Sequence, residues 1–230
     1  MSSIYLFVGL LTILMVAIET RYAPWSPYYW ITALFIFTIP YFDRTTIELF
    51  QHPFWNGFFG LTVLFFLGTM LWEMVLCTFV YEEILVPKIG KKLWSPTLVI
   101  ESLHHSVRLS KKWKDAAFIF LLVFWAPIAE ETFYCGFLFR NFRQDYGLMV
   151  SLLEVGFLSG CIHACQFFSL RPFPWPAAFA FGITAFGSII LNCLLFEWTH
   201  NIYILIVIHL TINVLWTIYQ HKKQGVVNLC

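Results

Sequence analysis

Residues 125–140 read WAPIAEETFYCGFLFR and place two adjacent glutamates, Glu130 and Glu131, inside a strongly apolar stretch. Ionisable side chains are expensive among lipid chains, at roughly 2.5–3.5 kcal/mol for a central Asp, Lys or Arg on insertion scales. Each such group therefore needs a hydrogen-bonding partner or a function. The stretch indicates a helix of a membrane protein whose glutamates face the interior of a helix bundle.

The composition of the whole chain also favours a membrane protein. Of the 230 residues, 60% are hydrophobic and 12% are charged, which leaves too little polar surface to cover a water-soluble fold. The formal net charge is +1 and no basic run accompanies a nucleic-acid motif, so nucleic acid is not an expected partner. The six cysteines lack CxxC spacing and are interpreted as small, reduced, apolar residues.

Seven segments approach the roughly 20 apolar residues that a membrane span needs. The sequence predicts an all-α, polytopic transmembrane helix bundle of about seven spans, with six or eight also compatible because the first two segments are short. Residues 1–230 are expected to form a single membrane domain without linkers or repeats. The predicted spans are approximately 3–18, 28–42, 58–80, 116–138, 148–168, 177–197 and 201–219.

The segment 81–115 differs from the predicted spans because it holds seven lysine and arginine residues. Val99, Leu103 and Val107 recur between them at helical spacing, which predicts an amphipathic helix on the membrane surface. In the seven-span arrangement, the side of the membrane with this loop carries eleven basic residues against three on the other side. The positive-inside rule then places the loop and the C-terminus in the cytoplasm and the N-terminus outside.

Further polar residues lie in two other predicted spans. His163 belongs to the fifth span, and His209 and Asn213 belong to the seventh. His209 and Asn213 are four residues apart and therefore share one helix face. The simplest packing solution is a polar cluster in the bundle interior, formed by these side chains and the adjacent glutamates.

The predicted helix ends raise one difficulty for this cluster. Counted from those ends at 1.5 Å per residue, Glu130 and His163 would differ in depth by about 10 Å, too far for a shared water molecule. The cluster therefore requires that the predicted ends are wrong by a turn, or that the helices are tilted or staggered.

The cluster has the groups that hydrolysis requires. A carboxylate beside an imidazole in a water-accessible pocket can hold and deprotonate a water molecule. A second histidine and an amide on one face can donate hydrogen bonds to the oxyanion that forms when that water attacks a carbonyl. The residues therefore indicate peptide hydrolysis within the membrane.

The order of these residues resembles the CAAX-protease and bacteriocin-processing family of glutamate-dependent intramembrane proteases. That family carries EExxxR, FxxxH and HxxxN/D motifs in this order, and the chain reads EETFYC, SGCIH and HLTIN at the matching places. The resemblance covers residues 95–215, which it identifies as a catalytic core. Residues 1–94 match only in being hydrophobic and are expected to be variable N-terminal spans.

The resemblance implies a role for each matching residue. Glu130 would be the catalytic base, His163 its partner on the nucleophilic water, and Glu131 a supporting second carboxylate. His209 and Asn213 would stabilise the oxyanion. The resemblance also implies a peptide or protein substrate at the membrane, lipidated or not, and no cofactor.

Two motif positions depart from the family pattern. Cys135 stands where the first motif has arginine, four residues after Glu131 and on its helix face, where a guanidinium could pair with that carboxylate. Without this cation, Glu131 is easier to protonate or must find another donor. Ser159 stands where the second motif has phenylalanine. Loss of the arginine either disables the site or retunes it.

Other interpretations stay open at this point. An inactive member of the same fold could act as an immunity factor, adaptor or binding protein, and buried glutamate and histidine could form the proton relay of a transporter. The glutamates could also be protonated acids bonded to backbone, or lie at a helix end outside the lipid. A zinc site made by Glu130, His163 and His209 is chemically feasible, but no HExxH spacing supports it. The compact length favours a bacterial inner membrane over the endoplasmic reticulum.

Overall fold

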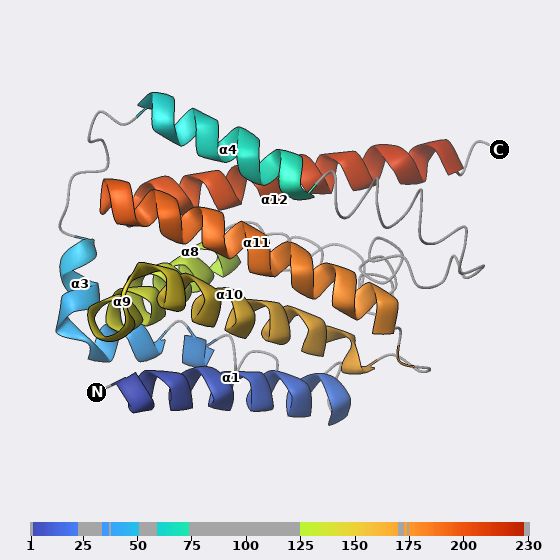
Figure 1. Cartoon of the computed structure of the whole chain (residues 1–230). Coiled ribbons are helices and arrows are strands. Elements are labelled where there is room, and N and C mark those ends of the chain that lie inside the picture. Colours follow the sequence, from blue (N-terminus) through green and yellow to red (C-terminus); the bar gives the residue numbers. More distant parts are fainter. Residues whose placement is uncertain are drawn as a thin grey trace.

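The computed structural model describes residues 2–22, 34–36, 38–50, 59–73, 125–169, 173 and 175–227. These residues lie in helices or in the turns between them, and none of them forms a strand. The all-α class is therefore confirmed for this part of the chain. The described helices pack side by side in one bundle (Figure 1).

The helices follow one another in a simple order. The N-terminal part contributes α1 (Ser2–Tyr22), the 3-10 turn η1 (Ile39–Phe42), α3 (Arg44–Leu49) and α4 (Phe59–Glu73). A continuous helical rod follows, made of α8 (Ala126–Glu131), the π-helical stretch η5 (Thr132–Phe139) and α9 (Arg140–Tyr146). The chain then forms α10 (Leu148–Cys165), the 3-10 turn η6 (Gln166–Ser169), α11 (Trp175–Thr199) and α12 (Ile202–Val227).

The rod α8–η5–α9 forms the centre of the core. All eight residues of η5 are buried, and Phe133 and Leu138 have no exposed surface. Helices α1, α10, α11 and α12 pack against different parts of the rod, as Figure 1 shows. The two adjacent glutamates therefore lie directly before the most deeply buried segment of the described fold.

Gly147 reverses the chain between α9 and α10. Its φ of 77° is a left-handed conformation that glycine adopts without strain. In the helical hairpin that results, Glu130 lies 17 residues before the turn and His163 lies 16 residues after it. The hairpin brings both side chains to one level, so the predicted depth difference is wrong. The prediction ended the fourth helix at residue 138, whereas the rod continues to Tyr146.

Glycines allow α10 and α11 to approach closely. A Cβ atom on Gly160 would lie 2.8 Å from the carbonyl oxygen of Gly182, and one on Gly182 would lie 2.9 Å from the carbonyl oxygen of Gly160. Small residues serve the same purpose at many helix crossings in membranes. This crossing fixes α10, which carries His163, against α11.

Some of the described helices have features that suit a membrane. Two of them, Leu148–Phe168 and Trp175–Thr199, are long and apolar enough to cross a bilayer. Large apolar side chains are exposed on the outer faces of α1, α4 and α10, among them Phe7, Leu64 and Phe157. Such surfaces suit contact with lipid tails better than contact with water. Shorter apolar helices cover Ser3–Ile18, Gly60–Trp72 and Ile202–Leu215.

The predicted spans agree best with the structure in the second half of the chain. There, the segments 148–168, 177–197 and 201–219 correspond to α10 with η6, to α11 and to α12. In the first half, α1 and α4 fall on the segments 3–18 and 58–80, while the end of 28–42 is the 3-10 turn around Pro40. The surface helix expected within 81–115 lies outside the described residues, and the count of seven spans stays a prediction.

Gly160→Ala is expected to destabilise the bundle, although alanine is intrinsically the better helix former by about 1 kcal/mol. The added methyl group would press on the Gly182 carbonyl oxygen, and overpacking of this kind costs about 1–3 kcal/mol. The unfolding free energy in detergent measures the effect.

Gly68→Ala in α4 is the matched control, because apart from the adjoining turns of α4 no described residue has an atom within 4 Å of the added Cβ. Its stability is expected to equal or slightly exceed that of the wild type. Equal losses from the two substitutions would contradict the close crossing of α10 and α11.

Candidate active site

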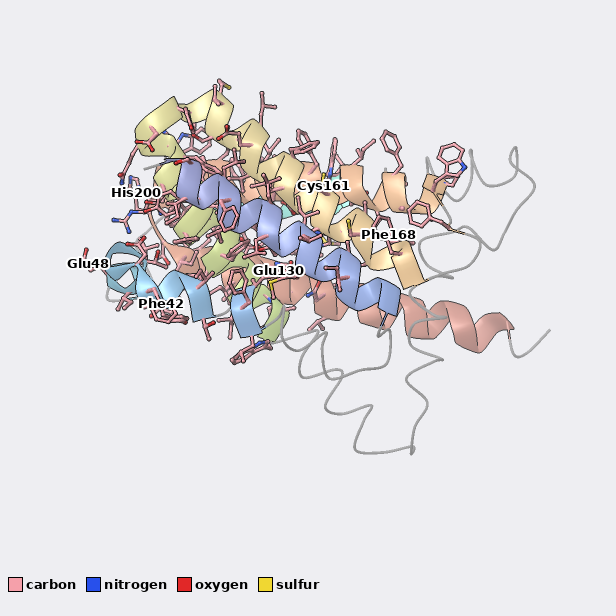
Figure 2. The ribbon with its side chains drawn as sticks, turned by 90° about the horizontal axis from the view of Figure 1, so that it is seen from below. Phe42, Glu48, Glu130, Cys161, Phe168 and His200 are labelled. Atoms are coloured by element: carbon pink, nitrogen blue, oxygen red, sulfur yellow. The ribbon has the colours of Figure 1, made fainter. Side chains whose placement is uncertain are left out.

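Two carboxylate–histidine pairs occupy the interior of the bundle. Glu130 Oε2 lies 3.8 Å from His163 Nε2, and Glu131 Oε1 lies 2.8 Å from His209 Nδ1. Because the glutamates are consecutive, the pairs are neighbours, built from α8, α10 and α12. In Figure 2, Glu130 lies about midway along the bundle, away from the end marked by His200.

The first pair has the geometry of a water-binding site. His163 Nδ1 lies 2.9 Å from the Ser159 carbonyl oxygen. A carbonyl oxygen only accepts, so Nδ1 carries the hydrogen and Nε2 of the neutral ring is the acceptor that faces Glu130. The Phe181 ring packs against the imidazole in an edge-to-face arrangement, at a centroid distance of 5.5 Å. The 3.8 Å between Glu130 and His163 is too long for a direct hydrogen bond and suits a bridging water.

The second pair is centred on a buried carboxylate. The side chain of Glu131 is 1% exposed, and its Oε1 accepts a hydrogen bond from Asn192 Nδ2 at 2.9 Å and one from His209 Nδ1 at 2.8 Å. Its Oε2 lies 3.5 Å from the Cys135 thiol, a weaker donor. These contacts come from three parts of the chain and offset the cost of burying a charge.

A pair of thiols occupies the position of the motif arginine. Cys135 Sγ and Cys193 Sγ are 3.2 Å apart, and neither residue has exposed surface. In place of the arginine, the Asn192 amide and the His209 ring donate hydrogen bonds to Glu131.

Asn192 was missed by the sequence analysis. It lies in the apolar segment GSIILNCLLFEW of α11, where it is buried. An amide in the middle of an apolar helix needs a partner for the same reason as a carboxylate does, and this signal was available. Its partner, 61 residues earlier in the chain, depends on how α11 packs against the rod.

Asn213 lies on α12 one turn beyond His209, and both residues are half-buried. Because α12 is one continuous helix, these two side chains lie on the same face, as expected. Within the described residues, no group of three His, Cys, Asp or Glu side chains is arranged to hold a metal ion. The zinc alternative therefore gains no support from this part of the chain.

Residues 112–215 match the family model described as type II CAAX prenyl endopeptidase, Rce1-like. The resemblance to the CAAX-protease family is thereby confirmed. The CAAX-protease match spans both carboxylate–histidine pairs and the residues that contact Glu131. This family is one of proteases, and together with the two long apolar helices it indicates a membrane protein. No curated protein and no solved structure matches the chain.

Cys135→Arg restores the motif of the CAAX-protease family, yet it is expected to destabilise the protein. The guanidinium would enter a site with no exposed surface that already contacts Cys193, and overpacking costs about 1–3 kcal/mol. The unfolding free energy in detergent measures the loss. Cys135→Ser keeps a small donor beside Glu131 and is the control, expected to be less destabilised. An arginine variant as stable as the wild type would contradict the tight packing at this position.

Proposed function

We propose that this chain is a membrane-embedded endopeptidase that hydrolyses a peptide or protein substrate with a water molecule activated by Glu130 and His163. The observation that carries the proposal is the separation of Glu130 Oε2 from His163 Nε2, 3.8 Å, with Nδ1 of the histidine committed to a carbonyl oxygen. Both side chains are partly exposed, 25% for Glu130 and 16% for His163, so neither is sealed inside the bundle.

The proposed reaction needs no covalent intermediate. A water about 2.8 Å from both groups donates one hydrogen to Glu130 and the other to His163 Nε2. Glu130 takes a proton as the water oxygen attacks the scissile carbonyl. When the carbon–nitrogen bond of the tetrahedral intermediate breaks, this proton passes to the leaving amine. The enzyme is then restored without a further reagent.

The second pair supplies electrostatic stabilisation. His209 and Asn213 are placed on one face of α12 and are assigned to the oxyanion of the tetrahedral intermediate. Nδ1 of His209 is bound to Glu131, so any donation from this ring to the substrate comes from Nε2. Glu131 acts as the supporting carboxylate that orients the ring.

The membrane setting follows from the same proposal. The chain would cross a bacterial inner membrane about seven times, with residues 95–215 as the catalytic core and residues 1–94 as variable spans. The matched family is named for prenyl endopeptidases, so a prenylated peptide is one candidate substrate and an unmodified peptide is the other. The amphipathic segment 81–115 would lie on the cytoplasmic surface.

The second candidate function is that of an inactive family member that binds a partner. Cys135 in place of the motif arginine favours it. The contacts of Glu131 with Asn192 and His209 argue for an intact site, because the carboxylate keeps two donors of ordinary hydrogen-bond length.

Glu130→Gln is expected to lower kcat/KM by about 10²- to 10⁴-fold, the usual contribution of a general base. The assay uses purified protein in liposomes with farnesylated and unmodified forms of one fluorogenic peptide that ends in a CAAX sequence. The fold should be retained, because glutamine has nearly the same shape.

Glu154→Gln is the matched control, the same chemical change on α10 at a position outside both pairs. Its kcat/KM is expected to equal that of the wild type. Hydrolysis that survives Glu130→Gln unchanged would contradict the proposed base. A wild-type protein that cleaves neither peptide but keeps its cellular effect after this substitution would favour the partner-binding function.

A further inference from the structure

We infer that Asn192 is a positioning residue that acts through Glu131 to hold His209 as an imidazolium, with Nδ1 directed to the carboxylate and Nε2 directed to the reaction. The assignment of His209 to the oxyanion rests on the proposed function. The hydrogen bonds that join Asn192, Glu131 and His209 do not, and they can be tested separately.

The direction of each hydrogen bond is fixed by chemistry. An ionised carboxylate only accepts, so the Asn192 atom that faces Glu131 Oε1 at 2.9 Å is its amide nitrogen, the donor. For the same reason, Nδ1 of His209 donates to this oxygen at 2.8 Å. One carboxylate oxygen thus joins α11 and α12 to α8.

This arrangement determines what the outer nitrogen of His209 can do. In a neutral ring with its hydrogen on Nδ1, Nε2 carries a lone pair and would repel an oxyanion. As long as Glu131 is ionised and accepts from Nδ1, donation from Nε2 therefore requires the doubly protonated ring. A carboxylate 2.8 Å away favours that form, and the pair as a whole has no net charge, which eases its burial.

Asn192 is needed because the pair could otherwise lose its charge separation. In apolar surroundings, the proton on Nδ1 can pass along the hydrogen bond to Oε1, which leaves a neutral acid and a neutral ring. A second donor on the same oxygen is a hydrogen bond that the ionised carboxylate accepts, so it supports the charge-separated form with the proton on the histidine. The ring then retains its positive charge, which makes it the stronger partner for a developing oxyanion.

The thiols extend this effect to the other carboxylate oxygen. Cys135 Sγ lies 3.5 Å from Glu131 Oε2, and Cys193 Sγ lies 3.2 Å from Cys135 Sγ. The amide and this thiol pair together occupy the place where a guanidinium would otherwise neutralise Glu131. The site is therefore retuned by neutral donors, which leave His209 as the positive partner of the carboxylate.

The first test compares the kinetics of Asn192→Leu and Asn192→Asp with those of Thr184→Val. Leucine keeps most of the volume without a donor, and aspartate keeps the shape but puts a second carboxyl group against Glu131. Both are expected to lower kcat by about 10- to 100-fold, the usual cost of losing an orienting hydrogen bond, with KM nearly unchanged. Thr184 bonds the Ala180 carbonyl of its own helix at 2.9 Å, and its substitution is expected to leave kcat as it is. An Asn192→Leu variant with wild-type kcat would overturn the inference.

The second test does not depend on activity. Nitrogen-15 NMR of histidine-labelled protein in nanodiscs, with the His209 signals assigned by their loss in His209→Gln, reports the protonation of each ring nitrogen. Both nitrogens of His209 are expected to be protonated at neutral pH in the wild type, and the Nδ1 signal is expected to shift in Asn192→Leu.

A wild-type ring that lacks a hydrogen on either nitrogen, or identical spectra for the two proteins, would overturn the inference. If Asn192→Leu does not fold, the wild-type spectrum still decides. If the spectra are as expected but no variant cleaves a peptide, the proposed function fails while the role of Asn192 in the pair stands.

Discussion

The structure depends on one constraint, the burial of the Glu131 carboxylate at 1% exposure among apolar helices. A charge in such surroundings costs several kcal/mol unless neighbouring groups donate to it. Asn192 on α11 and His209 on α12 provide the donors, at 2.9 and 2.8 Å. Because both bonds must form at one oxygen atom, they fix how α11 and α12 pack against the central rod. The apolar contacts around the rod then exclude water from this carboxylate.

The neighbouring glutamate is used differently because consecutive helix residues point in different directions. Glu130 is 25% exposed and faces His163 across 3.8 Å, whereas Glu131 faces the core. The Gly147 turn places Glu130 and His163 at the same level of the hairpin. Two identical side chains in sequence thus provide one partly exposed group beside His163 and one buried group that binds His209. A membrane protease would need both, the first to activate water and the second to hold the group that meets the oxyanion.

The sequence predicted the polar cluster because the cost of polar groups in a membrane leaves few packing solutions. Residue spacing alone left open which glutamate pairs with which histidine, because that depends on the rotation of α10 and α12 about the rod. The family resemblance paired Glu130 with His163 and gave Glu131 no histidine partner. The predicted difference in depth between Glu130 and His163 was wrong because the rod continues eight residues beyond residue 138, to Tyr146. The motif showed that Cys135 replaces an arginine beside Glu131. It did not show which groups lie there instead, because Asn192 and Cys193 come from a helix distant in the sequence. The sequence thus shows that the buried polar side chains need hydrogen-bonding partners, and the structure identifies those partners.

In the proposed mechanism, the tetrahedral intermediate lies between the Glu130–His163 pair and His209. The most direct measurement is an experimental structure of the protein with a phosphinic peptide, whose tetrahedral phosphorus carries two oxygens in place of the attacking water and the oxyanion. We expect one phosphinate oxygen about 3 Å from both Glu130 and His163, and the other about 3 Å from His209 Nε2. A bound phosphinate whose oxygens contact neither Glu130 nor His209 would contradict this mechanism.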